Sequence, residues 1–188
     1  MDITIDYYEC PLGKITLAAH EKALVGLWFN GQKYFGQMPN ISSISALSEL
    51  PQKEMAHKPS KLPVLQKTKQ WLDLYFSGKV PDFTPPLSMD ATSFRRSVWE
   101  IMLAIPYGQT ITYQDIAKQM AEKLGRKSMS AQAVGNAVAH NPCSLIIPCH
   151  RVVGSNGSLT GYAGGIDKKI KLLTLEHVDL SAFFVPNA

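Results

Sequence analysis

The sequence predicts an α+β protein built in two parts. Three strand-like patterns occupy the first 29 residues, and helical patterns with capping signals fill the second half. A proline-rich stretch at about residues 79–90 lies between the two parts and has the composition of a linker. We therefore expect two domains, residues 1–88 and 89–188, in a chain whose 188 residues suffice for one large or two small domains.

The composition is that of an ordinary folded, soluble protein, with 45% hydrophobic and 18% charged residues. The net charge of +4 and the pI near 8.9 suit a nucleic-acid partner but do not by themselves demonstrate one. The sequence has no basic and apolar leader and no run of about 18 apolar residues. We therefore expect no signal peptide and no membrane partner.

The cysteine content favours a reducing compartment. Cys10, Cys143 and Cys149 are an odd number and lack the spacing of a disulfide framework, so we expect a cytoplasmic protein. The sequence contains neither a CxxC pair nor an HxxxH helix. Cys10 and His20 would supply only two ligands, and we expect neither a metal nor another cofactor.

The first part predicts an antiparallel meander followed by one helix. Residues 2–8 alternate between polar and apolar side chains, and residues 15–19 and 24–29 continue the strand pattern after short turns. Residues 36–61 show no clear period and are predicted to be mostly loop. Apolar residues then recur at helical spacing over 65–76, and Gly78 is a suitable residue to end that helix.

The second part begins with three predicted helices. Thr92 or Ser93 can cap a helix that continues to about residue 103, and Thr112 with Asp115 resembles a capping box for residues 113–124. Ser130 can cap the next helix, residues 131–140. Two short helices joined by a polar turn fit a helix-turn-helix, whose second helix would enter a DNA groove.

The remainder of the second part predicts a strand, a turn and a final helix. Residues 145–147 form an apolar, strand-like run, and residues 155–158, Ser-Asn-Gly-Ser, are a strong turn signal. The final helix is expected at about residues 167–177.

The most informative segment is Pro148-Cys149-His150-Arg151. A thiol reacts strongly only as the thiolate, which a nearby base or positive charge can produce. Neighbouring residues on a regular strand face opposite ways, but Pro148 disfavours regular geometry, and a water could bridge the thiol and the imidazole. Glu176, or another carboxylate, could orient His150. The alternative is that Cys149 is a small buried apolar residue, as most lone cysteines are.

Other features leave two interpretations open. The helix at residues 131–140 carries almost only small side chains, which fit either close approach to a DNA minor groove or tight packing against another helix. Tyr113 could be an ordinary half-buried residue or a phenol that donates a proton within a site. Lys123, Arg126 and Lys127 form a basic cluster that is either a solvated face or a set of phosphate contacts.

These residues together resemble the O6-alkylguanine-DNA alkyltransferases, which are also called methylated-DNA–protein-cysteine methyltransferases. The resemblance runs from about Phe94 to Glu176. The matching motifs are Pro106-Tyr107-Gly108 with Thr112-Tyr113, Ala133-Val134-Gly135, Asn141-Pro142, Ile147-Pro148-Cys149-His150-Arg151-Val152 and Gly161-Tyr162-Ala163-Gly164-Gly165. The first part is similar to the family only in its layout of a small sheet and a helix.

The resemblance implies a fold and a reaction. The fold would be a small ribonuclease-H-like α/β domain with a three-stranded sheet, followed by a mainly helical winged helix-turn-helix domain. The protein would flip an alkylated guanine out of double-stranded DNA. It would then transfer the alkyl group from O6 irreversibly to Cys149, with O4-alkylthymine left open as a second substrate. Each molecule would act once, as a monomer without an obligate protein partner.

The resemblance also implies residue roles. His150 would take the thiol proton through a water, Glu176 would orient His150, and Asn141 would brace the turn before the cysteine. Tyr113 and Lys169 would stabilise the departing guanine, and Tyr162 and Ala163 would line the base pocket. The implied DNA contacts are Gln132, Ala133, Gly135 and Arg151.

Gln132 departs from the family pattern. The family's helix usually carries an arginine at this position, which wedges into the base stack where the flipped nucleotide has left it. Glutamine is neutral but can still fill space and hydrogen-bond to the orphaned base. We therefore expect base flipping to be retained with lower DNA affinity or a weaker salt dependence.

Two other function classes fit parts of the sequence. A helix-turn-helix sensor of alkylated DNA would bind damage without chemistry, but family relatives of that kind replace the cysteine. A Cys-His hydrolase would need an oxyanion hole and turnover, and nothing outside the Cys-His pair supports it.

Overall fold

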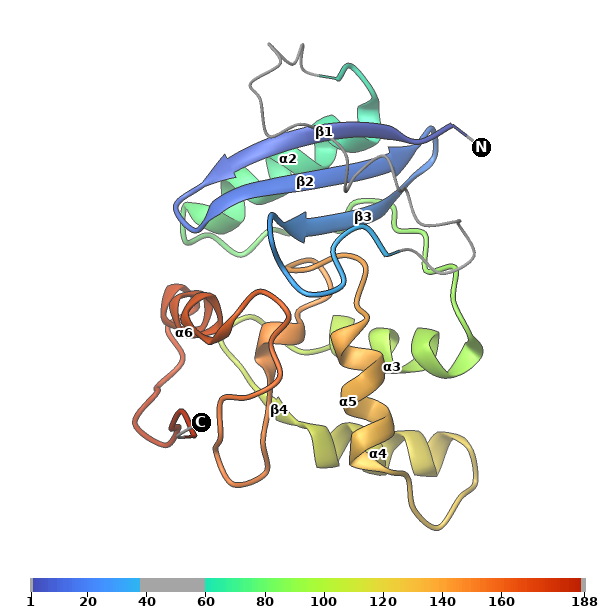
Figure 1. Ribbon diagram of the computed structural model, residues 1–188, viewed down its shortest axis with the longest axis vertical. Coiled ribbons are helices and arrows are strands. Elements are labelled where there is room, and N and C mark those ends of the chain that lie inside the picture. Colours follow the sequence, from blue (N-terminus) through green and yellow to red (C-terminus); the bar gives the residue numbers. More distant parts are fainter. Residues whose placement is uncertain (1, 38–59, 187–188) are drawn as a thin grey trace. The chain divides into compact units, whose positions relative to one another are not determined.

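The computed structural model describes residues 2–37 and 60–186 and divides into two compact units (Figure 1). The first unit comprises Met1–Ala91 together with Pro142–Ser144. The second comprises Thr92–Asn141 and Leu145–Ala188. A three-residue segment from the second half of the sequence thus folds with the first unit. The α+β fold class is confirmed.

The first unit contains the antiparallel meander that the alternation predicted. Strands β1 (Thr4–Cys10), β2 (Gly13–His20) and β3 (Ala23–Phe29) pair in the order β1-β2-β3. Cys10 and Gly13 close the first hairpin, where Gly13 has a φ of 110°, a value that side-chain-bearing residues rarely adopt. β3 is buried along its whole length, which explains its continuous apolar sequence.

Helix α2 (Pro63–Phe76) covers one face of this sheet and packs against all three strands (Figure 1). Its apolar stripe includes Leu65, Leu72 and Tyr75, each fully buried. Gly78 follows the helix with a φ of 78°, as the sequence predicted for its end. Most of the predicted loop at residues 36–61 lies outside the described residues.

The outer edge of β3 is covered by two separate segments. Leu24 donates its amide to the carbonyl of Pro86 at 2.8 Å, and Ser88 donates back to Leu24 at 2.8 Å. Leu27 forms the same kind of exchange with Pro142–Ser144. These bonds satisfy backbone groups that an open sheet edge would expose. Part of the proline-rich stretch is therefore fixed on the sheet rather than acting as an unattached linker.

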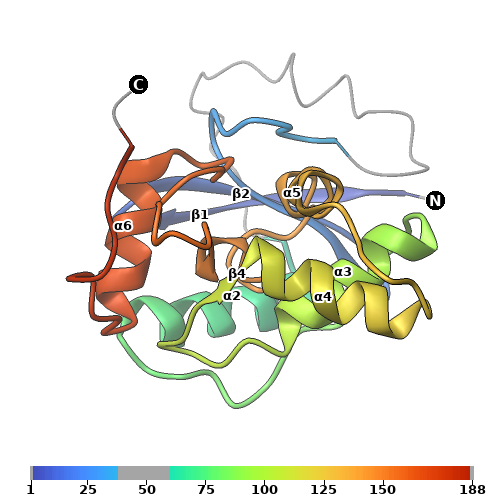
Figure 2. The same cartoon turned by 90° about the horizontal axis from the view of Figure 1, so that it is seen from below.

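In the second unit, helices α3 (Ser93–Leu103), α4 (Tyr113–Lys123) and α5 (Ala131–Ala139) pack against one another. Figure 2 views α5 end-on while α4 runs across the view, so the two helices cross steeply, as in a helix-turn-helix. Trp99 of α3 is fully buried and donates its indole N–H to the carbonyl of Ala137 at 2.9 Å. The small residues of α5 thus permit close helix packing on one face.

The segment after α5 differs from the sequence prediction. Residues 145–147 form turns rather than a strand, and Leu145 has a φ of 71°, in the left-handed region. A short 3-10 helix, η1 (Cys149–Arg151), follows and leads into β5 (Val152–Val153). β5 pairs in parallel with β4 (Ile111–Thr112) immediately before α4. Two-residue strands leave no periodic signal, so the sequence could not predict this pair.

The last helix, α6 (Ile166–Leu175), begins and ends close to the predicted bounds. It buries Leu172 and Leu173 completely. Glu176 is the residue that caps its C-terminal end, so this carboxylate has a defined backbone position.

Thr112→Ala should lower the free energy of unfolding by about 1 kcal/mol. The Thr112 hydroxyl accepts the Asp115 amide at 3.0 Å and donates to the Asp115 carboxylate at 2.6 Å, so alanine removes both bonds at the start of α4. Urea unfolding measures the change. Thr112→Ser keeps the oxygen and should remain close to the wild type. Equal stability of the alanine and serine variants would show that the cap contributes nothing.

Candidate active site around Cys149

Cys149 is almost completely buried at the first position of η1, with 5% of its surface exposed. Burial raises the pKa of this thiol, because a low dielectric disfavours the thiolate. Hydrogen bonds from the Asn141 side chain and from the backbone amides of Cys149 and His150, together with the charge of Lys169, act in the opposite direction without cancelling it. The resting cysteine is therefore a thiol surrounded by groups that favour its anion.

Asn141 connects two points of the turn that leads to the cysteine. It lies two residues after the end of α5, and its side-chain amide nitrogen donates to the carbonyl of Ile147 at 2.7 Å. The same side chain hydrogen-bonds the sulfur of Cys149. Asn141 is itself 5% exposed, so both interactions are shielded from water. Its position fits the bracing role that the family resemblance implied.

His150 and Glu176 form a fully buried pair. The imidazole Nε2 lies 2.7 Å from Oε1 of Glu176. Burial by itself raises the pKa of Glu176, but the hydrogen bonds and charges of His150 and Arg151 outweigh it and bring the pKa to about 2. The carboxylate is therefore ionised and can only accept hydrogen bonds, which assigns the proton on the imidazole to Nε2.

The other imidazole nitrogen, Nδ1, is then the basic one. Burial lowers the pKa of His150, because desolvation of the cation outweighs the favourable effect of Glu176. At neutral pH the ring is uncharged, with its Nε2–H directed at the carboxylate. A neutral imidazole oriented in this way can accept a proton at Nδ1, and the carboxylate stabilises the resulting cation.

Arg151 is held inside the protein instead of facing a DNA partner. It is 8% exposed, and its guanidinium forms two bonds with the Glu176 carboxylate, from Nε at 2.8 Å and from Nη2 at 3.0 Å. Nη1 donates to the carbonyl of Ile105 at 2.7 Å. Three of its five N–H donors are thus engaged within the protein, so Arg151 has a structural role at the site.

The loop after α3 supplies a further donor to Glu176. The amide of Gly108 donates to Oε2 at 3.2 Å. Gly108 has a φ of 76°, and a Cβ on it would lie 2.9 Å from the carbonyl oxygen of Glu176, so only glycine fits here. Tyr107 donates its hydroxyl to the carbonyl of Leu175 at 3.0 Å, which fixes the loop beside the end of α6.

Tyr113 and Lys169 meet at a single backbone carbonyl. Lys169 is fully buried and donates to the carbonyls of Val152 at 2.6 Å and Thr160 at 2.9 Å. The hydroxyl of Tyr113, at the start of α4, lies 3.4 Å from the same oxygen of Thr160. Burial lowers the pKa of Lys169 to about 8 and raises the pKa of Tyr113 to about 12, and the charge of Cys149 influences both. Both side chains are thus proton-bearing donors near the sulfur.

The glycine-rich loop at residues 161–165 lies close to this cluster. The ring of buried Tyr162 stands edge-on to His150, with ring centroids 6.4 Å apart. A Cβ on Gly161 would come within 2.6 Å of the Tyr113 hydroxyl, and one on Gly164 within 2.7 Å of the Tyr162 ring. Half-buried Ala163 lies in the turn between them. The absence of side chains here keeps space beside the phenol.

The predicted DNA contacts on α5 lie at the surface. Gln132 is exposed, and Ala133 and Gly135 are half-buried. A Cβ on Gly135 would meet Tyr113 only at ordinary contact distance, 3.9 Å, so its glycine is not required by that neighbour. The outer face of α5 therefore carries a neutral side chain on a helix with little bulk.

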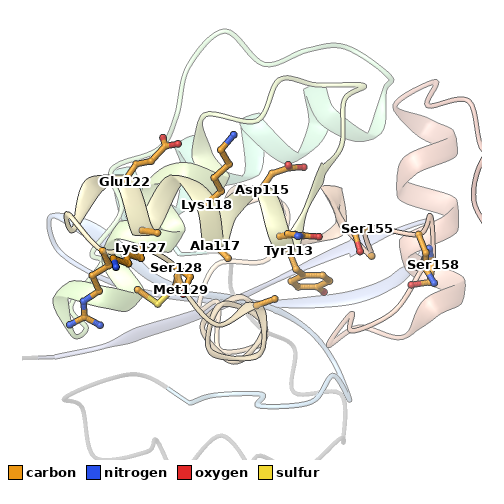
Figure 3. A pocket seen from close by; sticks show the side chains of 16 residues that line it. Tyr113, Asp115, Ala117, Lys118, Glu122, Lys127, Ser128, Met129, Ser155 and Ser158 are labelled. Carbon is orange, nitrogen blue, oxygen red and sulfur yellow. Dashed lines mark hydrogen bonds between the residues drawn. The ribbon is translucent and has the colours of Figure 1, made fainter.

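A polar groove of about 880 Å³ adjoins this helix (Figure 3). Figure 3 shows Lys118 and Glu122 on α4, Lys127 on the loop that follows it, and Ser155 on the turn after β5. Tyr113 also lines the groove. Since this phenol reaches the carbonyl of Thr160 as well, one residue connects the groove with the reactive cluster.

Both parts of the chain match sequence families. Residues 93–178 match the 6-O-methylguanine DNA methyltransferase, DNA binding domain, and residues 3–89 match the 6-O-methylguanine DNA methyltransferase, ribonuclease-like domain. The chain belongs to this family.

Named relatives align with this chain over nearly its whole length. A methylated-DNA–protein-cysteine methyltransferase of Methanosarcina barkeri is 39% identical over 176 residues, which are 93% of this chain and 98% of the relative. The crystal structure of the Mycobacterium tuberculosis O6-methylguanine methyltransferase aligns with a TM-score of 0.71 at 34% identity and covers 93% of each chain. A structure of the M. tuberculosis protein in complex with DNA aligns with a TM-score of 0.65 at 34% identity, over 94% of this chain and 92% of that one.

The sequence predicted the candidate side chains of this methyltransferase family member but not all of the groups that they contact in the structure. The carbonyls of Val152, Thr160 and Ile105 and the amide of Gly108 are backbone groups, which leave no residue-type signal. Arg151 was among the predicted site residues, but its ion pair with Glu176 was not predicted, because the two residues are 25 positions apart in the sequence.

The structure adds two observations on cofactors and membranes. Within residues 2–37 and 60–186, no group of three or more His, Cys, Asp or Glu side chains could hold a metal ion. None of the helices in the described part of the chain is long and apolar enough to cross a membrane.

Glu176→Gln should make the free energy of unfolding less dependent on pH in the acid range. The pKa of Glu176 is about 2 in the folded protein against 4.5 ordinarily, so its contribution is complete above pH 4.5 and is lost as the pH falls towards 2. The difference of 2.5 units corresponds to at most about 3 kcal/mol. Urea unfolding between pH 6 and pH 2 should show that the variant loses less of its free energy of unfolding than the wild type does as the pH falls. Glu100→Gln, which removes an exposed partner of Lys123, is the control and should follow the wild type. If the free energy of unfolding fell equally with pH in the wild type and in Glu176→Gln, Glu176 would not be the source of the acid sensitivity.

Proposed function

We propose that this protein repairs DNA by transferring an alkyl group from O6 of guanine to its own Cys149. The observation that carries the proposal is the buried Cys149–His150–Glu176 arrangement in a chain that belongs to the methyltransferase family in both its parts. The product is a thioether, which no group at the site can cleave. Each molecule therefore acts once, without a cofactor.

Thiol activation follows from the protonation states. Cys149 rests as a thiol because burial raises its pKa, and His150 rests as a neutral base because burial lowers its pKa. The thiol proton passes to Nδ1 of His150 through a water. Glu176 then faces an imidazolium at 2.7 Å, and Asn141 hydrogen-bonds the thiolate.

The transfer step is a displacement at the alkyl carbon. The thiolate sulfur forms a bond to that carbon while the bond between the carbon and O6 breaks, and the electron pair of the broken bond remains on the guanine. Lys169 and Tyr113 are the donors next to the sulfur that can stabilise this developing negative charge. The guanine leaves in its ordinary keto form after N1 takes up one proton, which balances the proton lost by the thiol, and the sulfur keeps the alkyl group.

Access to Cys149 requires that the base leave the duplex. A thiol with 5% exposure cannot reach an atom inside stacked DNA, so the target nucleotide must rotate out to the protein. The loop at residues 161–165, with Tyr162 and Ala163, is the proposed lining of the base pocket. α5 would lie in the minor groove, with Ala133 and Gly135 against the DNA and Gln132 in the vacated stack.

The polar groove is the proposed site for the phosphate backbone of the duplex. Lys118, Arg126 and Lys127 line it together with Ser155 and Asn156, which offer uncharged hydrogen-bond donors. Acidic residues of α4 also line the groove, so its positive field is moderate. Since Arg151 is internal, these groove cations are the proposed replacement for it in DNA contact.

The site favours chemistry over damage sensing. A sensor would need α5 and the groove but not a buried thiol hydrogen-bonded by Asn141 and placed near Lys169. We further propose that the protein acts as a monomer in the reducing cytoplasm. The absence of a disulfide among its three cysteines, all of which are described, supports that compartment.

Incubation with a duplex that contains O6-methylguanine should add the mass of one methyl group to the intact protein. Peptide mapping should place the methyl on Cys149, and Cys149→Ser should show no addition while still binding the duplex. Cys143→Ser, which removes a buried cysteine of the first unit, is the matched control and should still be methylated. Tight binding without a mass change would favour the sensor, and turnover of an ester or amide would favour the hydrolase.

Gln132→Arg should raise the affinity for duplex DNA at low salt and steepen its salt dependence by about one unit of the logarithmic slope, because the substitution adds one cation to the exposed face of α5. Gln132→Ala should slow single-turnover methyl transfer, since nothing would fill the vacated stack. Binding titrations at several salt concentrations and rapid-quench transfer rates provide the two measurements. Equal transfer rates for alanine and glutamine would exclude position 132 as the wedge.

A further inference from the structure

The backbone segment Pro142–Ser144 has an unusual position in the chain. It joins α5, which ends at Ala139, to the turn that presents Cys149, and both neighbours belong to the second unit. The segment itself folds with the first unit. Any shift of these three residues would therefore be transmitted along the backbone to Asn141 on one side and to Leu145 on the other.

Two backbone hydrogen bonds hold this segment against β3. Leu27 donates to the carbonyl of Pro142 at 2.8 Å, and Ser144 donates to the carbonyl of Leu27 at 2.9 Å. Cys143, between them, is 1% exposed. The segment thus behaves as a short added strand on the covered edge of the sheet.

Gln32 adds a side-chain bond at the same place. Its Oε1 accepts the amide of Phe29 at 2.9 Å and the hydroxyl of Ser144 at 3.2 Å. Gln32 is 8% and Ser144 2% exposed, so both bonds are protected from water. One oxygen therefore links the end of β3 to the residue that begins the cysteine turn.

The turn itself needs such support. Leu145, directly after Ser144, is buried with a φ of 71°, a conformation that costs free energy for a residue with a branched side chain. Strained residues of this kind persist only where their surroundings fix them. Asn141 closes the turn from inside by its bond to Ile147, and the bonds at Pro142–Ser144 fix its start.

We propose that Gln32 is a positioning residue for alkyl transfer, which acts through Ser144 on the turn that carries Asn141 and Cys149. This inference rests on the proposed function and assigns a part in it to the first unit, which contains none of the reactive side chains. Gln32 touches neither DNA nor the transferred group. Its contribution is to hold the amide of Asn141 in place relative to the sulfur.

Gln32→Leu should reduce the single-turnover transfer rate at saturating duplex about tenfold, because a small displacement of a reacting group costs one to two orders of magnitude. The duplex concentration at half-saturation should not change, since the exposed face of α5 is intact. The rate-against-pH profile should move to higher pH, because Asn141 would stabilise the thiolate less. Gln32→Glu keeps an acceptor oxygen for both bonds and should retain more of the transfer rate than Gln32→Leu, although its buried carboxylate lowers the stability of the fold.

Thr16→Val is the matched control. It removes another side-chain hydrogen bond of the first unit, from the buried Thr16 hydroxyl to the exposed Asn30 at 2.7 Å, without touching residues 142–144. It should lower the melting temperature comparably while leaving the transfer rate and the pH profile of the folded protein unchanged. Ser144→Ala removes one of the two Gln32 bonds. If Gln32→Leu does not fold, the transfer rate and pH profile of Ser144→Ala test whether Gln32 positions the cysteine turn.

Two results would overturn the inference. One is a Gln32→Leu protein with the rate and pH profile of the wild type. The other is equal slowing by Thr16→Val, which would reduce the effect to general destabilisation of the first unit. A wild-type protein that takes up no methyl group would instead contradict the proposed function itself, so the two failures are distinguishable.

Discussion

The buried carboxylate of Glu176 is the interaction on which the rest of the site depends. Its two oxygens accept hydrogen bonds from His150, from Arg151 and from the amide of Gly108. These donors come from η1 and from the loop after α3, while Glu176 itself ends α6. An unpaired carboxylate at this depth would be strongly unfavourable, so the three segments must come together for the charge to be tolerated. The ion network thus fixes the backbone around Cys149.

Arg151 has a consequence for the chemistry as well as for the fold. Its permanent positive charge keeps the pKa of Glu176 low, and the same charge contributes to lowering the pKa of His150. The carboxylate therefore remains ionised and the imidazole remains neutral over the physiological range. A catalytic base needs both conditions, because a protonated imidazole could not accept the thiol proton. The guanidinium therefore supports the same protonation states as burial of His150 and the His150–Glu176 bond do.

Local sequence signals predicted most helices and strands, whereas contacts between residues far apart in the sequence could not be predicted. Thr112 and Asp115 identified the start of α4 because a capping box is complete within four residues. Residues 145–147 were wrongly predicted as a strand because their apolar character reflects burial in a turn, which periodicity cannot distinguish. The covering of β3 by Pro142–Ser144 joins positions more than a hundred residues apart, and Gln32 carries no motif that would reveal it.

The burial of Cys149 suits a residue that can be used only once. An exposed thiolate would react with any small electrophile or oxidant, and each such event would inactivate a molecule of this protein. Here the thiol stays protonated while buried, and the groups that favour its anion are already in place around it. In the proposed mechanism, reactivity would then depend on a substrate that can enter the pocket and meet the donors of Tyr113 and Lys169. In the proposed reaction, selectivity for a flipped alkylated base would follow from the same desolvation that makes the resting cysteine unreactive.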